Sequence, residues 1–458
     1  MNKKFYKQKI KGIDLLRLLL LIVVVFLWLG GSSQVMATAT ATATATVTAT
    51  TDTAADVEFN PRYVIEGVEC EGNKKTKCPV ISHEYYQSVG ENVDFDEIQN
   101  AKLRLDARGL FDDVDISLKK GSLRGNVIVV IKVEEGTDIK FALNAGYGRG
   151  YEIRKKYFED NKKMEKTYEG TYLEGKVSDL NFLGKGKILS ATVLVSSSKS
   201  YPNDYYVNKL RYTNVSPSVL YTDPHLLDSK KWFLNFGLGS YYSKYRVDGY
   251  IRGASELGLT NNFELGWRFA DFSYISLEQN LQWVHRISRV GQGIYFHYGW
   301  NSENDHIIPT EGSVLSTGVK LYDNYMRYFK IGKYLDIYSN YIKHHALNQT
   351  NILSFQFANN FSLRYFEGGD THDEIELMPS LGCKYTNIFK RDFGESAEFK
   401  SAAWYINPTL RFNITNTGRT TREWRPTSYA LDGGIIMDTS SWTVKLSLML
   451  ELSYPQYI

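Results

Sequence analysis

The chain of 458 residues is poor in cysteine, proline and long apolar runs. It contains three cysteines and ten prolines, and its one long apolar run lies at the N-terminus. So few cysteines exclude a disulfide-dense scaffold, and a single apolar run excludes a bundle of membrane-spanning helices. The chain also has no large excess of charge of either sign, since it contains 54 Lys and Arg against 51 Asp and Glu. Without a clustered basic excess, nucleic acid is not an expected partner.

Aromatic residues and glycine are plentiful instead. Phe, Trp and Tyr make up 14% of the chain, which has 33 tyrosines and 36 glycines. This aromatic content excludes a disordered chain. The classes that remain are a soluble all-β protein and a membrane β-barrel. Barrels have unremarkable hydropathy because lipid-facing apolar residues alternate with polar residues of the lumen.

The N-terminus has the organisation of a secretory signal. Five lysines lie within residues 1–11, an uncharged apolar stretch covers 18–29, and small residues lead to Ala37. We predict a signal peptide over 1–37, cleaved after Ala37, and the alternative is a retained anchor helix. The Thr/Ala alternation of 38–56 has nothing large to bury and is interpreted as a solvated linker.

Residues 57–138 are interpreted as one small domain with the element order β-α-α-β-β. Asp94 is a residue type that caps helix N-termini, and Gly109 is typical of the position after a helix. The alternation of apolar and polar residues predicts the strands. The expected elements are strands over 62–69, 111–118 and 126–133, a short helix over 80–89 and a longer helix after Asp94.

Cys70 and Cys78 flank a lysine-rich turn within this domain. An oxidising compartment permits them to pair, and closing so short a loop would contribute roughly 2–3 kcal/mol. Two free thiols are the open alternative, and a zinc site is disfavoured because only His83 lies nearby. Cys383 has no sequence partner and is expected to be a free thiol in a strand.

Residues 139–458 are predicted to form a transmembrane antiparallel β-barrel of about sixteen strands, so the fold class is mainly β. Segments of alternating apolar and polar residues recur between Gly, Asn, Asp and Ser, and no run has helical periodicity. Soluble sandwiches and propellers are disfavoured by the length and by the lack of a blade repeat. The tryptophans expected in aromatic girdles are Trp232, Trp267, Trp283, Trp300, Trp404 and Trp442.

The domain over 57–138 resembles the POTRA module, the polypeptide-transport-associated domain of the periplasm. The matching positions are Val64, Gly67, Gly72, Asn73, Arg104, the Gly-Leu-Phe-Asp-Asp-Val segment over 109–114 and the last strand over 127–134. The resemblance implies that the domain binds extended client segments by adding a strand at an exposed sheet edge.

A POTRA domain followed directly by such a barrel resembles the BamA-type outer-membrane assembly factors, also called bacterial surface antigens. Three short turn motifs of the barrel carry this resemblance. They are Asn181-Phe-Leu-Gly184-Lys-Gly186, Asp223-Pro224, and Asp305 followed by Pro309 and Gly312.

The family signature Val-Arg-Gly-Phe/Tyr has a counterpart in Leu363-Arg364-Tyr365-Phe366, in which tyrosine replaces glycine. The resemblance implies that Arg364 lies in the barrel lumen beside an acidic wall residue, and the alternative is that it merely ends a strand. The resemblance also implies a weak lateral seam between the first and last barrel strands. The residues expected at that seam are Gly146, Gly148, Leu448 and Leu450.

Enzymatic motifs are missing from the sequence. It has no Gly-x-Ser-x-Gly elbow, the glycines over 146–150 are not followed by a helix, and His344-His345 has no carboxylate at metal-ligand spacing. We therefore expect no enzyme, no metal and no cofactor. The resemblance implies an assembly factor that folds β-barrel proteins and inserts them through the lateral seam. A POTRA-barrel secretion translocator and a passive porin are the alternatives.

The expected partners follow from the same resemblance. They are unfolded β-barrel client proteins at the POTRA edge strand, membrane lipids and accessory assembly subunits. The signal places the chain in a bacterial outer membrane with the POTRA domain in the periplasm. A mitochondrial or plastid outer membrane stays open because the chain has only one POTRA-like domain.

Overall fold

A computed structural model describes residues 63–155, 162–200, 210–247, 254–270, 272–285, 289–303, 309–326, 329–365, 374–389, 399–416, 425–439 and 441–453. The predicted signal peptide and the linker over 38–56 lie outside these residues. Of the helices described, none is long and apolar enough to cross a membrane.

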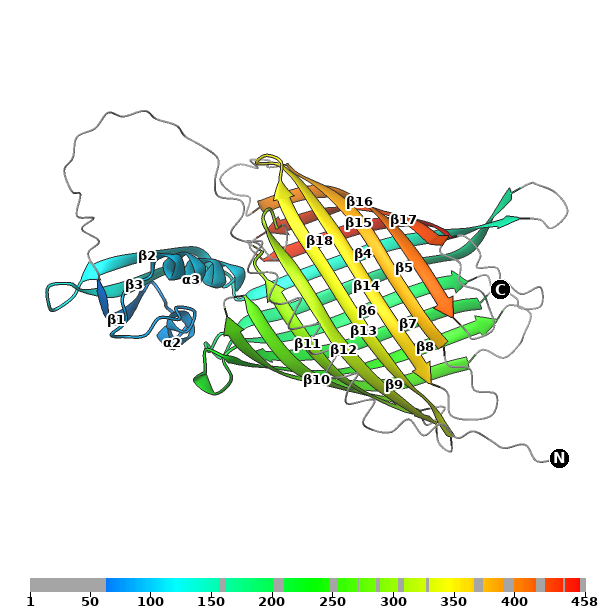
Figure 1. Cartoon of the computed structure of the whole chain (residues 1–458), viewed down its shortest axis with the longest axis horizontal. Helices are drawn as coiled ribbons and strands as arrows, with labels where there is room; N and C mark the ends of the chain where they lie inside the picture. Colours follow the sequence, from blue (N-terminus) through cyan, green and yellow to red (C-terminus); the bar gives the residue numbers. More distant parts are fainter. Residues whose placement is uncertain are drawn as a thin grey trace, which may run out of the picture. The chain divides into compact units, whose positions relative to one another are not determined.

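The N-terminal domain has the predicted order of two helices between a first strand and two later ones. Its elements are β1 (Val64–Glu71), α2 (Cys78–Ser82), α3 (Phe95–Ala107), β2 (Phe111–Lys120) and β3 (Asn126–Glu135). β3 lies in the middle of the sheet, parallel to β1 and antiparallel to β2. Figure 1 shows α3 lying along this sheet.

Two local signals fix the ends of α3. The Asp94 carboxylate accepts a hydrogen bond from the Asp96 backbone N–H at 2.9 Å, and Gly109 has a φ of +65° after the helix. These are the N-cap and the left-handed end that the sequence predicts. Between them, α3 turns Ala101 and Leu105 into the core. The buried core comprises Ile65, Ile81, Tyr85, Ala101, Leu105, Leu110, Phe111, Val114, Val129, Ile131 and Val133.

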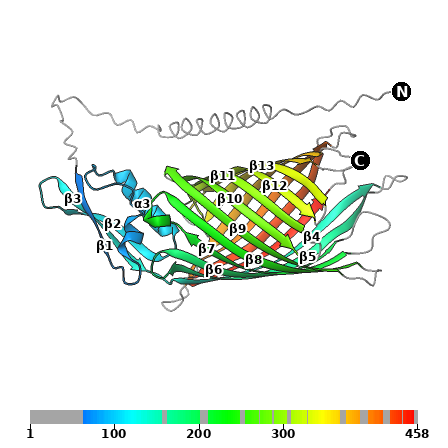
Figure 2. The same ribbon diagram turned by 90° about the horizontal axis from the view of Figure 1, so that it is seen from below.

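The described residues from Ile139 onward form a closed barrel of fifteen strands, which run obliquely around it (Figure 1 and Figure 2). This number is near the sixteen expected. Fourteen neighbouring pairs are antiparallel, and the barrel closes by a parallel pair of β18 with β4. The strands are β4 (Ile139–Lys155), β5 (Lys162–Phe182), β6 (Lys187–Ser200), β7 (Leu210–Asp223), β8 (Trp232–Val247), β9 (Ala254–Ala270), β10 (Ser273–Val284), β11 (Arg289–Asn301), β12 (Gly312–Met326), β13 (Phe329–Ala346), β14 (Asn351–Tyr365), β15 (Glu374–Phe389), β16 (Phe399–Asn416), β17 (Arg425–Thr439) and β18 (Trp442–Ser453).

Alternation along the strands separates an apolar outer surface from a polar lumen. On β18, Leu446, Leu448 and Leu450 are exposed outward, whereas Lys445 and Ser447 have the opposite parity. Large apolar side chains are exposed in the same alternating way on other strands, for example Leu173, Leu238, Leu277, Phe296, Phe355 and Leu381. An apolar band on the outer surface is typical of a membrane-spanning barrel.

The helix expected over 80–89 is shorter than predicted and ends at Ser82. The residues that follow make contacts that a helix would prevent. Tyr85 is fully buried in the core, and the backbone N–H of Tyr86 donates to the buried Glu97 carboxylate at 2.5 Å. These long-range contacts outweigh the helical pattern.

Candidate functional site

The turn between β5 and β6 forms hydrogen bonds with the N-terminal domain. Buried Asn181 uses both ends of its amide: Oδ1 accepts from the Gly186 N–H at 2.9 Å, and Nδ2 donates to Thr76 Oγ1 at 2.9 Å. The backbone N–H of Lys77 donates to the Gly184 carbonyl oxygen at 3.2 Å. The predicted Asn-x-x-Gly-x-Gly motif therefore lies at a domain contact. We call the barrel end that bears this turn the domain-side end.

Both glycines of this turn are required by its geometry. Gly184 and Gly186 have φ values of +67° and +62°, where side chains are strained. A Cβ on Gly184 would lie 2.8 Å from the Lys75 carbonyl oxygen. A Cβ on Gly186 would lie 2.3 Å from Val80 Cγ1 and 2.8 Å from Arg108 Nη1. The absence of these side chains lets the two domains approach closely.

We expect Gly186→Ala to loosen this contact, because the added methyl group collides with the domain and the positive φ adds about 1–2 kcal/mol of strain. Gly175→Ala on β5 is the matched control, since a Cβ there would meet nothing within 4 Å. Spin labels on Ser117→Cys and Leu347→Cys, in a Cys383→Ser background, report the domain-to-barrel distance. A distribution that stays narrow in Gly186→Ala would contradict the role of this glycine.

The turn between β7 and β8, which includes the short helix η1 (Leu226–Asp228), makes the second contact. Buried Asp223 accepts from Lys187 Nζ at 2.8 Å and from the His225 N–H at 3.2 Å. Arg268 Nη1 donates to the Pro224 carbonyl oxygen at 2.7 Å. The Asp-Pro motif thus orients His225, whose Nε2 lies 2.9 Å from Glu84 Oε1 in the N-terminal domain.

Glu84 is the centre of this contact. Its carboxylate lies 2.6 Å from Arg108 Nε, and its carbonyl oxygen accepts from the Arg104 guanidinium at 2.9 and 2.7 Å. Lys230 of the barrel turn donates to the Tyr85 carbonyl oxygen at 2.6 Å. We call these contacts, together with those of the β5–β6 turn, the junction.

Burial by itself raises the pKa of Glu84, but Arg108 and His225 hold it down at about 2. Glu84 is therefore ionised at neutral pH despite its burial. Glu84 and His225 carry no motif in the sequence, since they lie 141 residues apart and only the fold joins them. A lone glutamate followed by two tyrosines gives no local signal of this role.

The depressed pKa predicts that the junction weakens in acid. The contribution of Glu84 is complete above its ordinary pKa of 4.5 and is lost as the pH falls towards 2. The groups that face it are Arg108, His225 and Arg268, and protonation of Glu84 removes the negative charge that holds it beside them. The spin-label distance distribution should broaden between pH 4.5 and 2 in the wild type. If the distance distribution of Glu84→Gln is narrow at neutral pH and broadens in acid as in the wild type, Glu84 is not the group responsible.

The barrel closes at the pair of β18 and β4, which we call the seam. Its register runs from Trp442 opposite Phe141 to Ser453 opposite Glu152. Parallel pairs have slanted hydrogen bonds and are slightly less stable per residue than antiparallel pairs. The residues expected at the seam lie within it, with Gly146 opposite Ser447, Tyr147 opposite Leu448, Gly148 opposite Met449 and Arg149 opposite Leu450.

Two tyrosines of β5 bridge the seam on the lumen side. The hydroxyls of Tyr172 and Ser447 share a hydrogen bond of 3.0 Å, and the Tyr168 hydroxyl donates to Glu451 Oε2 at 2.7 Å. Both partners belong to β18, so each ring reaches across β4. The bridges therefore tie the last strand to the second strand of the barrel rather than to the first.

Glycines on β4 make room for these rings. A Cβ on Gly146 would lie 2.4 Å from Tyr172 Cε1, and a Cβ on Gly150 would lie 2.1 Å from Tyr168 Cε1. Gly146, which the sequence places at the seam, is thus also the position against which the ring of Tyr172 packs. Gly148 faces Met449, whose Cε lies 3.5 Å from the position of a Cβ.

The sheet of the N-terminal domain has one open edge. The outer edge of β1 is partly covered, because the Ile65 N–H donates to Glu91 at 2.9 Å and the Val93 N–H donates to Tyr63 at 2.8 Å. Within the described residues, no strand pairs with the outer edge of β2. The exposed charged residues of β2 are acidic at its start and basic at its end: Asp112, Asp113, Asp115, Lys119 and Lys120.

The loop motif is described in its backbone up to Tyr365. Arg364 and Tyr365 are the last residues of β14, where Arg364 is in register with Tyr334 and Glu374. Their backbone is thus strand rather than loop. The side chains of Arg364 and Tyr365, and all of Phe366, lie outside the part that the structure describes.

The third turn motif is only partly described, since Asp305 lies outside the described residues. Pro309 is half-buried before β12, and Gly312 has a φ of +98° at the start of β12. A Cβ on Gly312 would lie 2.1 Å from the Ser302 carbonyl oxygen. This glycine lets the two ends of the turn approach each other.

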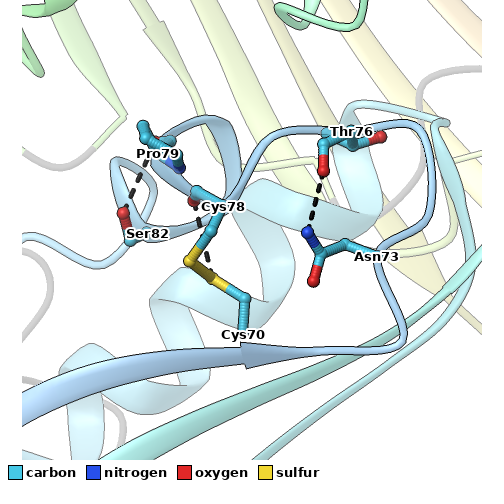
Figure 3. Close-up of a disulfide and its surroundings, with 6 residues drawn as sticks. All are labelled: Cys70, Asn73, Thr76, Cys78, Pro79 and Ser82. Atoms are coloured by element: carbon cyan, nitrogen blue, oxygen red, sulfur yellow. Dashed lines mark hydrogen bonds between the residues drawn. A yellow bond between two sulfur atoms is a disulfide. The ribbon is translucent and has the colours of Figure 1, made fainter.

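Cys70 and Cys78 form a disulfide between β1 and the start of α2 (Figure 3). Their Cα atoms are 5.7 Å apart. In the same turn, Asn73 Nδ2 donates to the Thr76 carbonyl oxygen at 2.9 Å. Since Thr76 and Lys77 contact the barrel turn at Asn181 and Gly184, the disulfide closes the loop that carries part of the junction.

Replacing both cysteines with serine is expected to destabilise the N-terminal domain by roughly 2–3 kcal/mol, because the open loop gains conformational entropy in the unfolded chain. Urea unfolding followed by the fluorescence of the full chain measures this change. Cys383→Ser is the control, since this cysteine is free. An unchanged unfolding midpoint in the double variant would contradict the stabilising role.

His344, considered for metal binding in the sequence, is occupied by other contacts. Its Nε2 lies 2.8 Å from Glu303 Oε1, and its Nδ1 lies 2.8 Å from Ser354 Oγ. Across the described ranges, no group of three His, Cys, Asp or Glu residues could hold a metal ion.

A family model described as POTRA, the surface antigen variable number repeat, matches residues 63–136. Residues 63–136 are a POTRA domain. The predicted combination of a POTRA domain with a closed barrel is confirmed. The junction therefore joins a POTRA domain to the turns of its own barrel.

Solved structures similar to this chain include one BamA and two CdiB proteins. BamA from Haemophilus ducreyi lacking POTRA domains 1–3 is 13% identical, with 84% of each chain covered and a TM-score of 0.38. CdiB from Acinetobacter baumannii is 11% identical, with 85% of this chain and 74% of that chain covered and a TM-score of 0.44. CdiB from Escherichia coli is 9% identical, with 82% and 73% covered and a TM-score of 0.39. At these values the likeness carries no argument about activity.

Proposed function

We propose that this chain folds β-barrel proteins and inserts them into a bacterial outer membrane through the seam. The observation that carries the proposal is a POTRA domain with an open β2 edge, fixed by the buried junction to a barrel that closes by a parallel pair. A passive pore needs neither the domain nor the junction. The POTRA domain and its disulfide lie in the periplasm in this proposal, where disulfides persist.

The β2 edge receives an unfolded client as an added strand. Main-chain hydrogen bonds supply most of the affinity in this mode, so the edge accepts many sequences. Asp113 and Asp115 favour a client segment with basic residues at one end, and Lys119 favours an acidic residue at the other. Accessory subunits bind the remaining exposed surface of the POTRA domain in this proposal.

The seam then offers the client a template at membrane depth. A strand that enters hydrocarbon alone leaves its amides unpaired, at a cost of several kcal/mol for each. Opening the β4–β18 pair exposes backbone donors and acceptors that satisfy the first client strand. The exposed leucines of β18 contact lipid on the outer side of that opening.

Depletion of the protein followed by quantitative proteomics of the outer membrane tests this function. We expect many unrelated β-barrel proteins to decline together. Arrest of one secreted protein alone would replace the proposal with that of a secretion translocator. If no protein changes, the assembly proposal fails, and a passive porin becomes the alternative to test. Fractionation of the same cells tests the location, since recovery with a mitochondrial or plastid outer membrane would overturn the bacterial assignment.

A further inference from the structure

Cations cluster on the outer surface of the barrel at the end opposite the domain-side end, which we call the far end. β6 ends there and β7 begins there, and Lys199 and Arg211 are register partners across this pair of strands. Both are exposed, and they lie on the same face of the sheet as the outward-facing Val195. Lys244 on β8, two residues before the register partner of Arg211, is also exposed.

One carboxylate holds two cations of this cluster. Glu169 on β5 is in register with Arg149 on β4 and with Lys199 on β6. Its Oε1 lies 3.3 Å from Lys199 Nζ, and its Oε2 lies 3.6 Å from Arg149 Nη2. Arg149 Nε also donates to the Tyr147 hydroxyl at 2.8 Å. Four cations, Arg149, Lys199, Arg211 and Lys244, thus stand against one carboxylate, and we call them the far-end cations.

The register places two like charges side by side. Side chains directly opposite each other on one face of a sheet have Cβ atoms roughly 4.5–5.5 Å apart, and like charges at such positions repel. Lys199 and Arg211 are such a pair. An anion that contacts both offsets the repulsion and accepts charge-assisted hydrogen bonds from each.

The far-end cations have clear lateral limits among the described residues. The register partner of Arg149 on β18 is Leu450, and the register partner of Lys244 on β9 is Ser255. The cluster therefore extends from β4 to β8. Four strand spacings of 4.7–4.9 Å make this width roughly 19 Å. A headgroup with two phosphates contacts more of this width than one phosphate does.

Below the paired cations, the outward side chains of β6 and β7 change character in matched layers. Towards the domain-side end the next outward pair is Ser197 with Thr213, and the pair after it is Val195 with Val215. Charged, hydroxyl and apolar groups therefore follow one another on one face. A membrane lipid has the same order of groups, with phosphate outermost, then its sugar or ester region, then its acyl chains. The apolar layer is where a membrane-spanning barrel contacts lipid.

We propose that the far-end cations bind the phosphates of a phosphorylated glycolipid, whose acyl chains lie against the valines of β6 and β7. With the POTRA domain in the periplasm, as in the proposed function, this lipid belongs to the outer leaflet. The contact itself does not require that the barrel inserts other proteins. It gives the chain a specific lipid partner beside β4–β8.

The probe is diphosphoryl lipid A, a glycolipid with a phosphate at each end of its disaccharide. The purified full chain in detergent micelles is titrated with it, and native mass spectrometry measures the lipid retained. Lys199→Gln with Arg211→Gln is expected to weaken binding about thirtyfold, which corresponds to about 2 kcal/mol for two cations near an anionic lipid surface. Monophosphoryl lipid A should bind the wild type more weakly than the diphosphoryl form.

The matched control is Lys231→Gln with Lys343→Gln, because both lysines are exposed near the domain-side end. It removes the same charge and should leave binding unchanged. The exchange of Lys199→Arg with Arg211→Lys keeps both charges and should retain the lipid. Equal weakening in the control, or loss of binding in the exchange variant, would overturn the proposal.

Competing ligands test the source of the phosphate. Phosphatidylcholine that binds as tightly as lipid A would show that the acyl chains alone account for binding, and would overturn the proposal. Displacement of lipid A by an equal concentration of inorganic phosphate would also overturn it, because the site would then be one for free phosphate.

The lipid site and the assembly function can fail separately. If lipid A binds as expected but outer-membrane barrels do not depend on the protein, the assembly function fails and the lipid site stands. If the barrels depend on the protein but the far-end substitutions leave lipid A binding unchanged, only the lipid site fails.

Discussion

Replacing Glu84 with glutamine is expected to release the POTRA domain from its fixed position on the barrel. The neutral amide keeps the shape of the side chain but leaves Arg108 buried without its carboxylate, beside His225 and Arg268. Breaking a buried ion pair by removing one partner costs about 3–5 kcal/mol. That is large enough to turn a docked domain into a mixture of positions.

The measurement is the distance distribution between labels on Ser117→Cys and Leu347→Cys, which should change from narrow to broad. Glu69→Gln is the matched control. Glu69 lies 3.5 Å from Lys119 in an exposed ion pair of the same domain, and such pairs contribute about 1 kcal/mol or less. A narrow distribution in Glu84→Gln, or equal broadening in Glu69→Gln, would contradict the central place of Glu84 in the junction.

Locking the seam is expected to abolish client insertion. Ala142→Cys and Thr443→Cys face each other across β4 and β18, so a short bifunctional thiol reagent joins them and prevents separation. With no open edge, a client strand has no template and its unpaired amides oppose entry into hydrocarbon. We expect the insertion rate to fall by more than about tenfold, since every 1.4 kcal/mol added to the barrier is a factor of ten.

The matched control for the lock is a cross-link between Lys176→Cys and Thr192→Cys, which pair across β5 and β6. It constrains an ordinary antiparallel pair and should leave insertion unchanged. If the cross-linker is cleaved with a reductant to unlock the seam, the reductant can also reduce the disulfide of Cys70 and Cys78. The control variant, treated in the same way, measures the effect of that reduction on insertion. Full insertion with a locked seam would show that clients do not pass between β4 and β18.

The sequence predicts the local structure well. Alternation locates the strands, Asp94 and Gly109 mark the ends of α3, and the glycine motifs mark tight turns. These features depend on residues a few positions apart, so their signals are readable in one chain. The short turn motifs also mark the junction, although nothing in them indicates that Asn181 and His225 contact the POTRA domain.

The features that the sequence does not predict depend on contacts between positions far apart in the chain. The bond between Tyr168 and Glu451 joins residues 283 positions apart, and no spacing rule relates them. The direction of the closing pair depends on whether the number of strands is odd or even. A sequence estimate that is wrong by one strand therefore predicts an antiparallel seam in place of a parallel one. The early end of α2 likewise depends on Tyr85 and Glu84, which the core and the junction withdraw from the helix.

The most direct test of the central claim is insertion by the purified protein. The full chain is reconstituted in liposomes, a urea-unfolded outer-membrane β-barrel protein is added, and its protease-resistant folded form is followed with time. The proposed function predicts faster folding than in empty liposomes, with the acceleration lost when Ala142→Cys and Thr443→Cys are cross-linked. Equal folding rates with and without the unlocked protein would contradict the claim that this chain is an assembly factor.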